Sequence, residues 1–165
     1  MSRLIFVFTG LWAGLLAASW MFASITFGTA TALSLPDARA ELREKTAALT
    51  DSDRRIVLRF MASEINRTMF RRWLYVQFAV GGVLFLMAAR QGWTALYIAA
   101  ALVLMLVQLG LAPQILTLGR SIDFLPRPLP PDIGARFGRL HGAYVLLDFA
   151  KMAALLLYAW RGGRD

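Results

Sequence analysis

Residues 137–160 form an apolar run of roughly bilayer-spanning length that nevertheless carries several polar side chains. On a helix with about 100° per residue, four of them fall within one arc of roughly 80°; they are His141, Tyr144, Asp148 and Lys151. A polar stripe on an apolar helix has to face something other than lipid. The rest of the chain must therefore supply neighbouring helices that cover it.

Three further apolar stretches precede this one, at residues 4–33, 73–89 and 93–118. Hydrophobic residues make up 58% of the chain, well above the usual level of about 45–50% in soluble domains. We therefore expect an all-α integral membrane protein, in which one domain of residues 1–165 forms a bundle of four transmembrane helices.

The first stretch has two interpretations. Arg3 before an apolar run, with Ala17-Ala18-Ser19 as a possible cleavage region, is typical of a signal peptide. We favour a retained span, because the run continues well beyond the usual length of a signal. Small residues recur every four positions at Gly10, Gly14 and Ala18, a pattern that predicts a helix-packing face.

Residues 34–72 are polar and are expected to form a helical cytoplasmic connection between the first two spans. The run from Thr50 to Asp53 is typical of a helix start. The arginine-rich segment that follows, residues 54–72, could lie on an anionic membrane surface or extend straight into the second span. We favour the extension, because the apolar residues of the segment spread widely around the helix.

The third span contains a proline that predicts a helix break. Pro113 removes a backbone donor and leaves the carbonyl of Leu109 without its helical partner. The amide side chain of Gln108 lies next to this position. Counted inward from the cytoplasmic end of each span, Gln108 and Asp148 reach the same level of the bilayer.

Lysine and arginine are distributed unevenly between the two sides of such a bundle. The two long connections, residues 34–72 and 119–140, hold thirteen of them, whereas the termini and the turn at Arg90 hold four. The positive-inside rule therefore places the connections in the cytoplasm and both termini outside.

Two interpretations of the polar layer remain open. His141, Tyr144, Asp148, Lys151 and Gln108 could line a cavity for an ion, a proton or a ligand. The interpretation that we favour is a satisfied network that fixes helix register, or a contact with another subunit.

Composition excludes several kinds of site. The chain has no cysteine and one histidine, so it has no disulfide, no iron–sulfur ligands and no bis-histidine haem. We expect no metal and no cofactor, although His141 could be a single axial ligand to a pigment or haem. No catalytic motif is present, so we do not expect an enzyme. Membrane topology explains the net charge of +8 without nucleic acid.

The last apolar helix resembles the signature of the transmembrane protein 205 family and of a related bacterial family of small four-span proteins. The resemblance rests on Phe137, Arg139, His141-Gly142, Leu146 and a polar residue at 148, together with Leu111-Ala112-Pro113 and Leu11-Trp12-Ala13-Gly14. It implies a four-helix membrane protein but no known reaction. This chain has Asp148 where the family usually has asparagine, with Lys151 one turn further on.

These features together predict a multi-pass protein of a bacterial inner membrane. We expect a structural or accessory subunit that packs in the lipid bilayer against the subunits of a larger complex, with photosynthetic and respiratory complexes as candidates. The alternative is a small homo-oligomeric transporter or channel with its site around Asp148.

Overall fold

The computed structural model describes residues 3–35, 37 and 39–162. Every regular element in these ranges is a helix, and five are α-helices. The elements in chain order are α1 (Arg3–Leu33), α2 (Ala40–Lys45), α3 (Asp51–Ala88), the short 3₁₀-helix η1 (Gly92–Thr94), α4 (Ala95–Ser121) and α5 (Pro131–Gly162).

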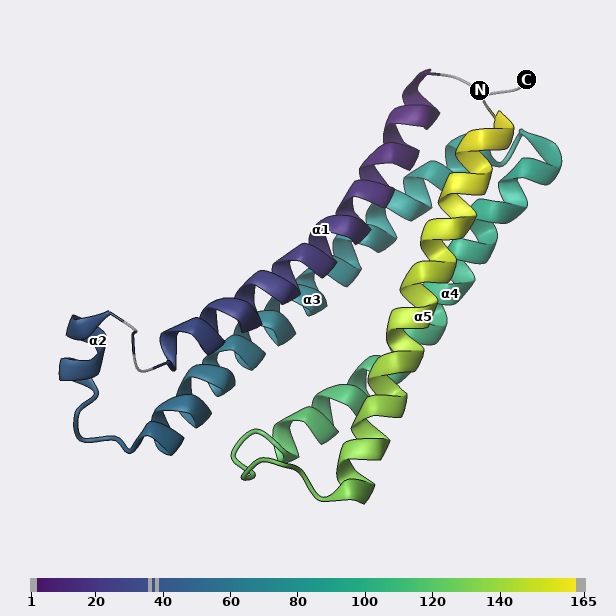
Figure 1. Cartoon of the computed structure of the whole chain (residues 1–165). Coiled ribbons are helices and arrows are strands. Elements are labelled where there is room, and N and C mark those ends of the chain that lie inside the picture. Colours follow the sequence, from purple (N-terminus) through teal and green to yellow (C-terminus); the bar gives the residue numbers. More distant parts are fainter. Residues whose placement is uncertain (1–2, 36, 38, 163–165) are drawn as a thin grey trace.

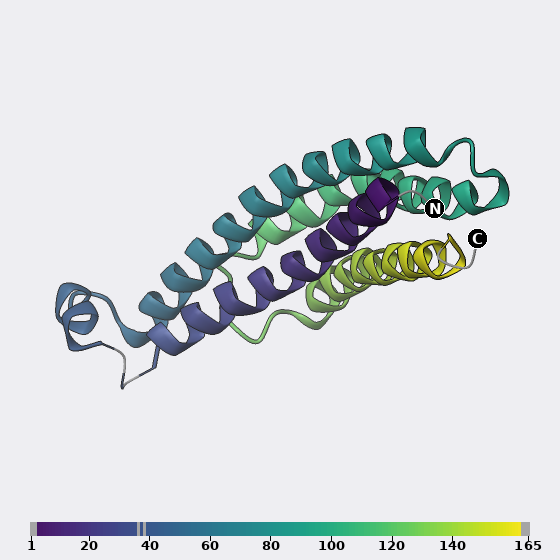
Figure 2. The same ribbon diagram turned by 90° about the horizontal axis from the view of Figure 1, so that it is seen from above.

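The four long helices are arranged as two antiparallel pairs. Helix α1 lies along α3, and α4 lies along α5 (Figure 1). The pairs meet at the end where α1 begins and α5 ends, and they diverge toward the opposite end. The short helix α2 lies at the far end of the molecule from the chain termini (Figure 2). Because α1 and α4 run in the same direction, α3 must return the chain between them.

Among the described residues, three helical segments are long and apolar enough to cross a membrane: Arg3–Leu33, Gly92–Ser121 and Pro131–Arg161. Helix α3 does not reach this standard, because its apolar part begins only at Trp73 and the helix ends at Ala88. At about 1.5 Å per residue this part is about 24 Å long, somewhat less than the roughly 30 Å of a bilayer core.

Helix α3 also contains the arginine-rich segment. It runs without interruption from Asp51, so residues 54–72 extend the apolar part rather than form a separate surface helix. Thr50 caps its first turn, where the side-chain oxygen accepts a hydrogen bond from the backbone N–H of Asp53 at 3.1 Å. The predicted helix start at Thr50 to Asp53 is therefore confirmed, because α3 begins there.

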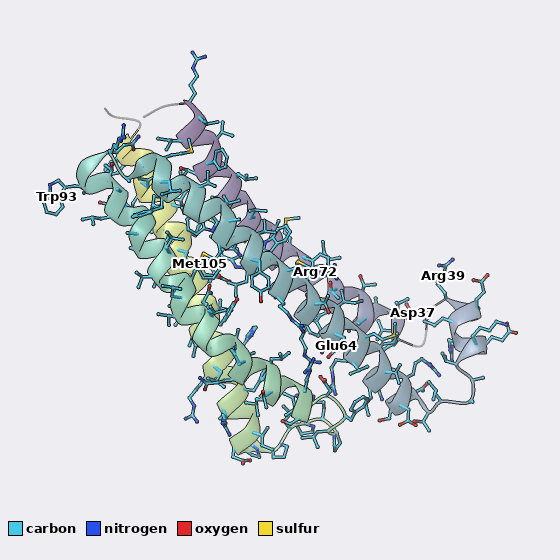
Figure 3. The ribbon with its side chains drawn as sticks, turned by 180° about the vertical axis from the view of Figure 1, so that it is seen from behind. Asp37, Arg39, Glu64, Arg72, Trp93 and Met105 are labelled. Atoms are coloured by element: carbon cyan, nitrogen blue, oxygen red, sulfur yellow. The ribbon has the colours of Figure 1, made fainter. Side chains whose placement is uncertain are left out.

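The predicted break at Pro113 is wrong. Helix α4 continues through this residue to Ser121, because a proline removes only one hydrogen bond and its ring can be accommodated by a bend. Figures 1 and 3 show the second, green half of α4 turning away from the line of the first half. The proline redirects the helix and does not end it.

The predicted packing face on α1 is not used within the chain. Gly10, Gly14 and Ala18 are exposed, and a Cβ on either glycine would meet nothing within 4 Å. The close approach occurs instead at Gly81 of α3, where a Cβ would lie 2.6 Å from the ring of Trp12. The bulky indole fits because the opposite helix has no side chain at this point, so α1 turns Trp12 toward α3 and leaves Gly10 and Gly14 outside.

The end that holds the chain termini is closed by a tight turn. Gly92 has a φ of 62°, a left-handed conformation that glycine adopts without a steric cost. The next residue, Trp93, is 85% exposed and projects away from the bundle (Figure 3). In the interior, the apolar core includes the fully buried Met105, which lies midway along the bundle.

Candidate functional site

A buried ion pair on α5 is the centre of the polar interior. Asp148 and Lys151 are three residues apart and therefore lie on the same helix face. The Lys151 Nζ atom is 2.8 Å from Asp148 Oδ1, and Lys151 and Asp148 are 1% and 6% exposed. Two ionised groups this deeply buried require further hydrogen bonds to offset the loss of water.

Gln108 of α4 supplies most of those bonds. Its side-chain oxygen accepts a hydrogen bond from Lys151 at 2.6 Å. Its amide nitrogen donates to Asp148 Oδ1 at 2.9 Å and to the backbone carbonyl of Tyr144 at 3.0 Å. The residue is completely buried, so this one amide binds both charges and joins α4 to α5.

Helices α1 and α3 complete the network. Gln77 of α3 accepts hydrogen bonds from Lys151 at 3.4 Å and from the indole of Trp12 at 3.2 Å. The indole of Trp20 donates to Asp148 Oδ2 at 3.4 Å, and its ring packs against Phe149 with centroids 4.9 Å apart. All four long helices therefore contribute to one connected set of polar groups.

The lysine in this network has no donor left for a ligand. An ammonium group has three N–H donors, and Lys151 Nζ contacts three acceptors, on Asp148, Gln108 and Gln77. Both oxygens of Asp148 also have donors. A site of this kind can hold helices in register, because any slip would leave a buried charge without its partner.

The structure brings together three of the five predicted polar residues through their side chains: Gln108, Asp148 and Lys151. Tyr144 contributes its backbone carbonyl, and its side chain is partly buried. The prediction that His141 belongs to the buried layer is wrong. The His141 side chain is exposed, and its ring stacks on that of Phe137 with the ring centroids 5.8 Å apart. His141 lies on the same helix face as Asp148, seven residues earlier on α5, yet only Asp148 is buried.

Sequence reasoning missed the two tryptophans of α1 and assigned Gln77 no role in the network. Trp12 and Trp20 are eight residues apart and so lie about 80° apart around the helix, on the same side of it. An indole N–H in an apolar span needs a hydrogen-bond acceptor. This requirement indicates from the sequence alone that each tryptophan has a polar partner. The identity of each acceptor depends on how the helices pair and could not be found from the spacing alone.

A second cluster ties α3 to the segment after α4, outside the apolar stretches. Arg67 of α3 forms ion pairs with Asp123 and with Glu64, and Arg59 donates to the backbone carbonyl of Asp123 at 3.2 Å. Asp123 is 5% exposed. We call these four residues the Arg67 cluster.

The charges of the cluster reinforce one another. Burial lowers the pKa of Arg67, but the hydrogen bonds and charges of Asp123 and Glu64 outweigh burial and raise it above its ordinary value. The guanidinium is therefore charged at every physiological pH. The cluster fastens the end of α4 to α3 at the side where the helix pairs diverge.

The described residues contain no group of three or more histidine, cysteine, aspartate or glutamate side chains placed to hold a metal ion. His141 is exposed on α5, so a pigment or haem could reach its ring only from outside the bundle. Comparison with protein-family models, with curated proteins and with solved structures found no match to this chain.

Proposed function

We propose that this protein is a four-span, non-enzymatic subunit that packs against another protein in the membrane. Four spans follow if α1 and α4 both cross, because they run in the same direction and the chain must cross back between them (Figure 1). Helix α3 is the described helix that makes this return. Its short apolar part is compatible with a span if Arg71 and Arg72 extend toward the lipid headgroups.

The charge distribution supports one orientation. Residues 34–72 and 119–140, which precede and follow the helices at the α2 end, carry thirteen lysines and arginines, against four before residue 34, at the turn of Arg90 and after residue 160 in the sequence. By the positive-inside rule, the α2 end is cytoplasmic and both termini lie outside. We propose the inner membrane of a bacterium as the location. This proposal rests on the predicted resemblance to the bacterial four-span family.

The observation that carries the accessory role is the outward face of α1. Gly10, Gly14 and Ala18 lie on the side of the helix opposite the buried residues Trp12 and Leu16. Small residues in this spacing let two helices approach closely in lipid. Because α1 packs on α3 with its other side, this face remains free for a helix of another protein.

The interior network supports a structural role for the polar groups. A transporter built around Asp148 would need a place for its substrate, whereas Lys151 already uses its three donors within the protein. The buried ion pair in an apolar helix is nevertheless the feature that favours the alternative, a homo-oligomeric transporter or channel. The two functions differ in what the protein associates with.

The test is to extract the protein from native membranes in mild detergent and to measure the size and content of the particles. An accessory subunit migrates with a larger complex of other proteins, whose absorption spectrum shows whether pigments or haem are present. Gly14→Leu should release the chain from this complex. Ala153→Leu, which enlarges an exposed small residue on α5, is the matched control and should not.

A particle that contains only copies of this chain would contradict the accessory role and support the transporter. Equal behaviour of the Gly14→Leu and Ala153→Leu proteins would show that the α1 face is not the contact.

A further inference from the structure

A hollow of about 440 Å³ lies between the second half of α4 and the first turns of α5. Its lining from α4 is Pro113, Gln114, Thr117, Leu118 and Ser121, and α5 contributes Arg136. The second half of α4 turns away from α5 (Figure 1), and Pro113, the proline inside this helix, lines the hollow. The Arg67 cluster holds the end of α4 in this position, on the side of α3.

Arg136 presents a guanidinium group to this hollow. Its side chain is exposed, and within the described part of the chain no carboxylate forms an ion pair with it. By contrast, Arg67 and Arg120 pair with acidic residues. A guanidinium has five N–H donors arranged in a fork that fits the oxygens of a phosphate group.

The α4 side of the hollow adds polar groups at the same place. The Thr117 hydroxyl makes no hydrogen bond with another described residue, so both its donor and its acceptor are available. Ser121 donates to the carbonyl of Leu118 at 2.9 Å, which leaves its oxygen free to accept. Pro113 and Leu118 make the remaining surface apolar.

This combination of a cation, hydroxyl groups and apolar surface fits a phospholipid better than a free anion. Arginine-containing pockets between transmembrane helices on the cytoplasmic side are suited to anionic lipid headgroups. The hollow lies at the basic end of the molecule, where α4 and α5 leave their apolar stretches. An acyl chain could continue along the apolar surface while the headgroup stays beside Arg136.

We infer that this hollow binds the phosphate group of an anionic phospholipid, with Arg136 on the phosphate oxygens and Thr117 as a second donor. The inference goes beyond the accessory role and requires only that α4 and α5 cross the bilayer. A lipid bound here fills the space that the bend of α4 opens between the two helices.

The experiment measures the lipids retained by the full-length purified protein, by native mass spectrometry from nanodiscs. The nanodiscs contain phosphatidylcholine and phosphatidylglycerol in equal amounts. The unaltered protein should retain phosphatidylglycerol preferentially. Arg136→Gln should lower that preference about fivefold, the effect of losing one basic contact at an anionic surface, and Arg136→Lys should lower it less.

Arg139→Gln is the matched control. It removes the same charge from an exposed position on the same helix, but Arg139 does not line the hollow, so the preference should be kept. Equal losses for Arg136→Gln and Arg139→Gln would overturn the inference, because they would indicate general attraction to the basic surface. Displacement of the lipid by millimolar inorganic phosphate would overturn it too, because the site would then bind phosphate from solution.

Failure of this experiment would leave the accessory role intact, since that role is judged by protein association. Loss of the accessory role would likewise leave the lipid measurement valid. A uniform lipid preference in all variants, with each protein still inserted in the nanodisc, would show that the hollow is not a lipid site.

Discussion

The indole ring of Trp12 occupies the space that a side chain at Gly81 would fill. A Cβ at Gly81 would lie 2.6 Å from one ring carbon of Trp12, 2.9 Å from another and 2.9 Å from a methyl carbon of Leu102. Trp12 is completely buried, so the ring cannot move aside into free space. The contact therefore sets how closely α1 and α3 approach each other.

Gly81→Ala should destabilise the bundle by about 1–3 kcal/mol, the usual cost of overpacking a closed interior. The measurement is the midpoint of thermal unfolding in detergent. Gly82→Ala is the control, because a Cβ at Gly82 meets nothing within 4 Å and should leave the midpoint unchanged or raise it slightly. Equal midpoints for the two variants would contradict the packing described here.

Lys151→Met should destabilise the protein more than the double variant Lys151→Met with Asp148→Asn. The single change leaves a buried carboxylate without its cation, which typically costs about 3–5 kcal/mol. The double change removes both charges and places an uncharged amide of similar size at position 148. Both are compared by unfolding in detergent with the unaltered protein.

Should the double variant be no more stable than Lys151→Met, the two charges do not act as a pair. Gln108→Leu provides a further check, since it removes the amide that contacts both charges. It should destabilise the protein as well, because it leaves buried polar groups unsatisfied.

Arg67→Met should loosen the connection between α3 and the segment after α4. The change leaves Asp123, which is 5% exposed, as a buried carboxylate without its partner. Hydrogen exchange of the backbone around Asp123 should become faster. Arg71→Met removes an exposed arginine from the same helix and serves as the control; protection that falls equally in both variants would argue against a specific contact.

Pro113→Ala should straighten α4 and move its end away from α3. The chain contains no cysteine, so two spin labels can be placed at Met61→Cys and Ser121→Cys without removing native thiols. The distance distribution measured by electron–electron double resonance should shift when the Pro113→Ala change is added to this labelled pair. An unchanged distribution would mean that the Arg67 cluster, rather than the proline, determines the direction of the helix.

The four long helices and part of the polar interior could be predicted from the sequence. Helical periodicity places Asp148 and Lys151 on one face, and counting from the span ends brings Gln108 to their level. The first inference depends on regular helix geometry alone, and the second adds only the assignment of the span ends to the two sides of the membrane. They required no knowledge of which helices are neighbours.

The remaining features depend on how the helices are arranged. His141 lies on the same face as Asp148, yet it is exposed whereas Asp148 is buried. Gly10 and Gly14 have the spacing of a packing face, but Trp12 and its contact with Gly81 decide which side of α1 turns inward. A pattern along one helix cannot reveal these outcomes, since each depends on the shape of a second helix.

The place of Lys151 on α5, which follows α1, α3 and α4 in chain order, has a consequence for biosynthesis. Ribosomes release α1, α3 and α4 first, so Gln77 and Gln108 enter the membrane before the ammonium that both of them bind. A chain cut short before α5 would leave these amides without it. The polar interior is therefore satisfied only once α5 has packed against the helices made before it.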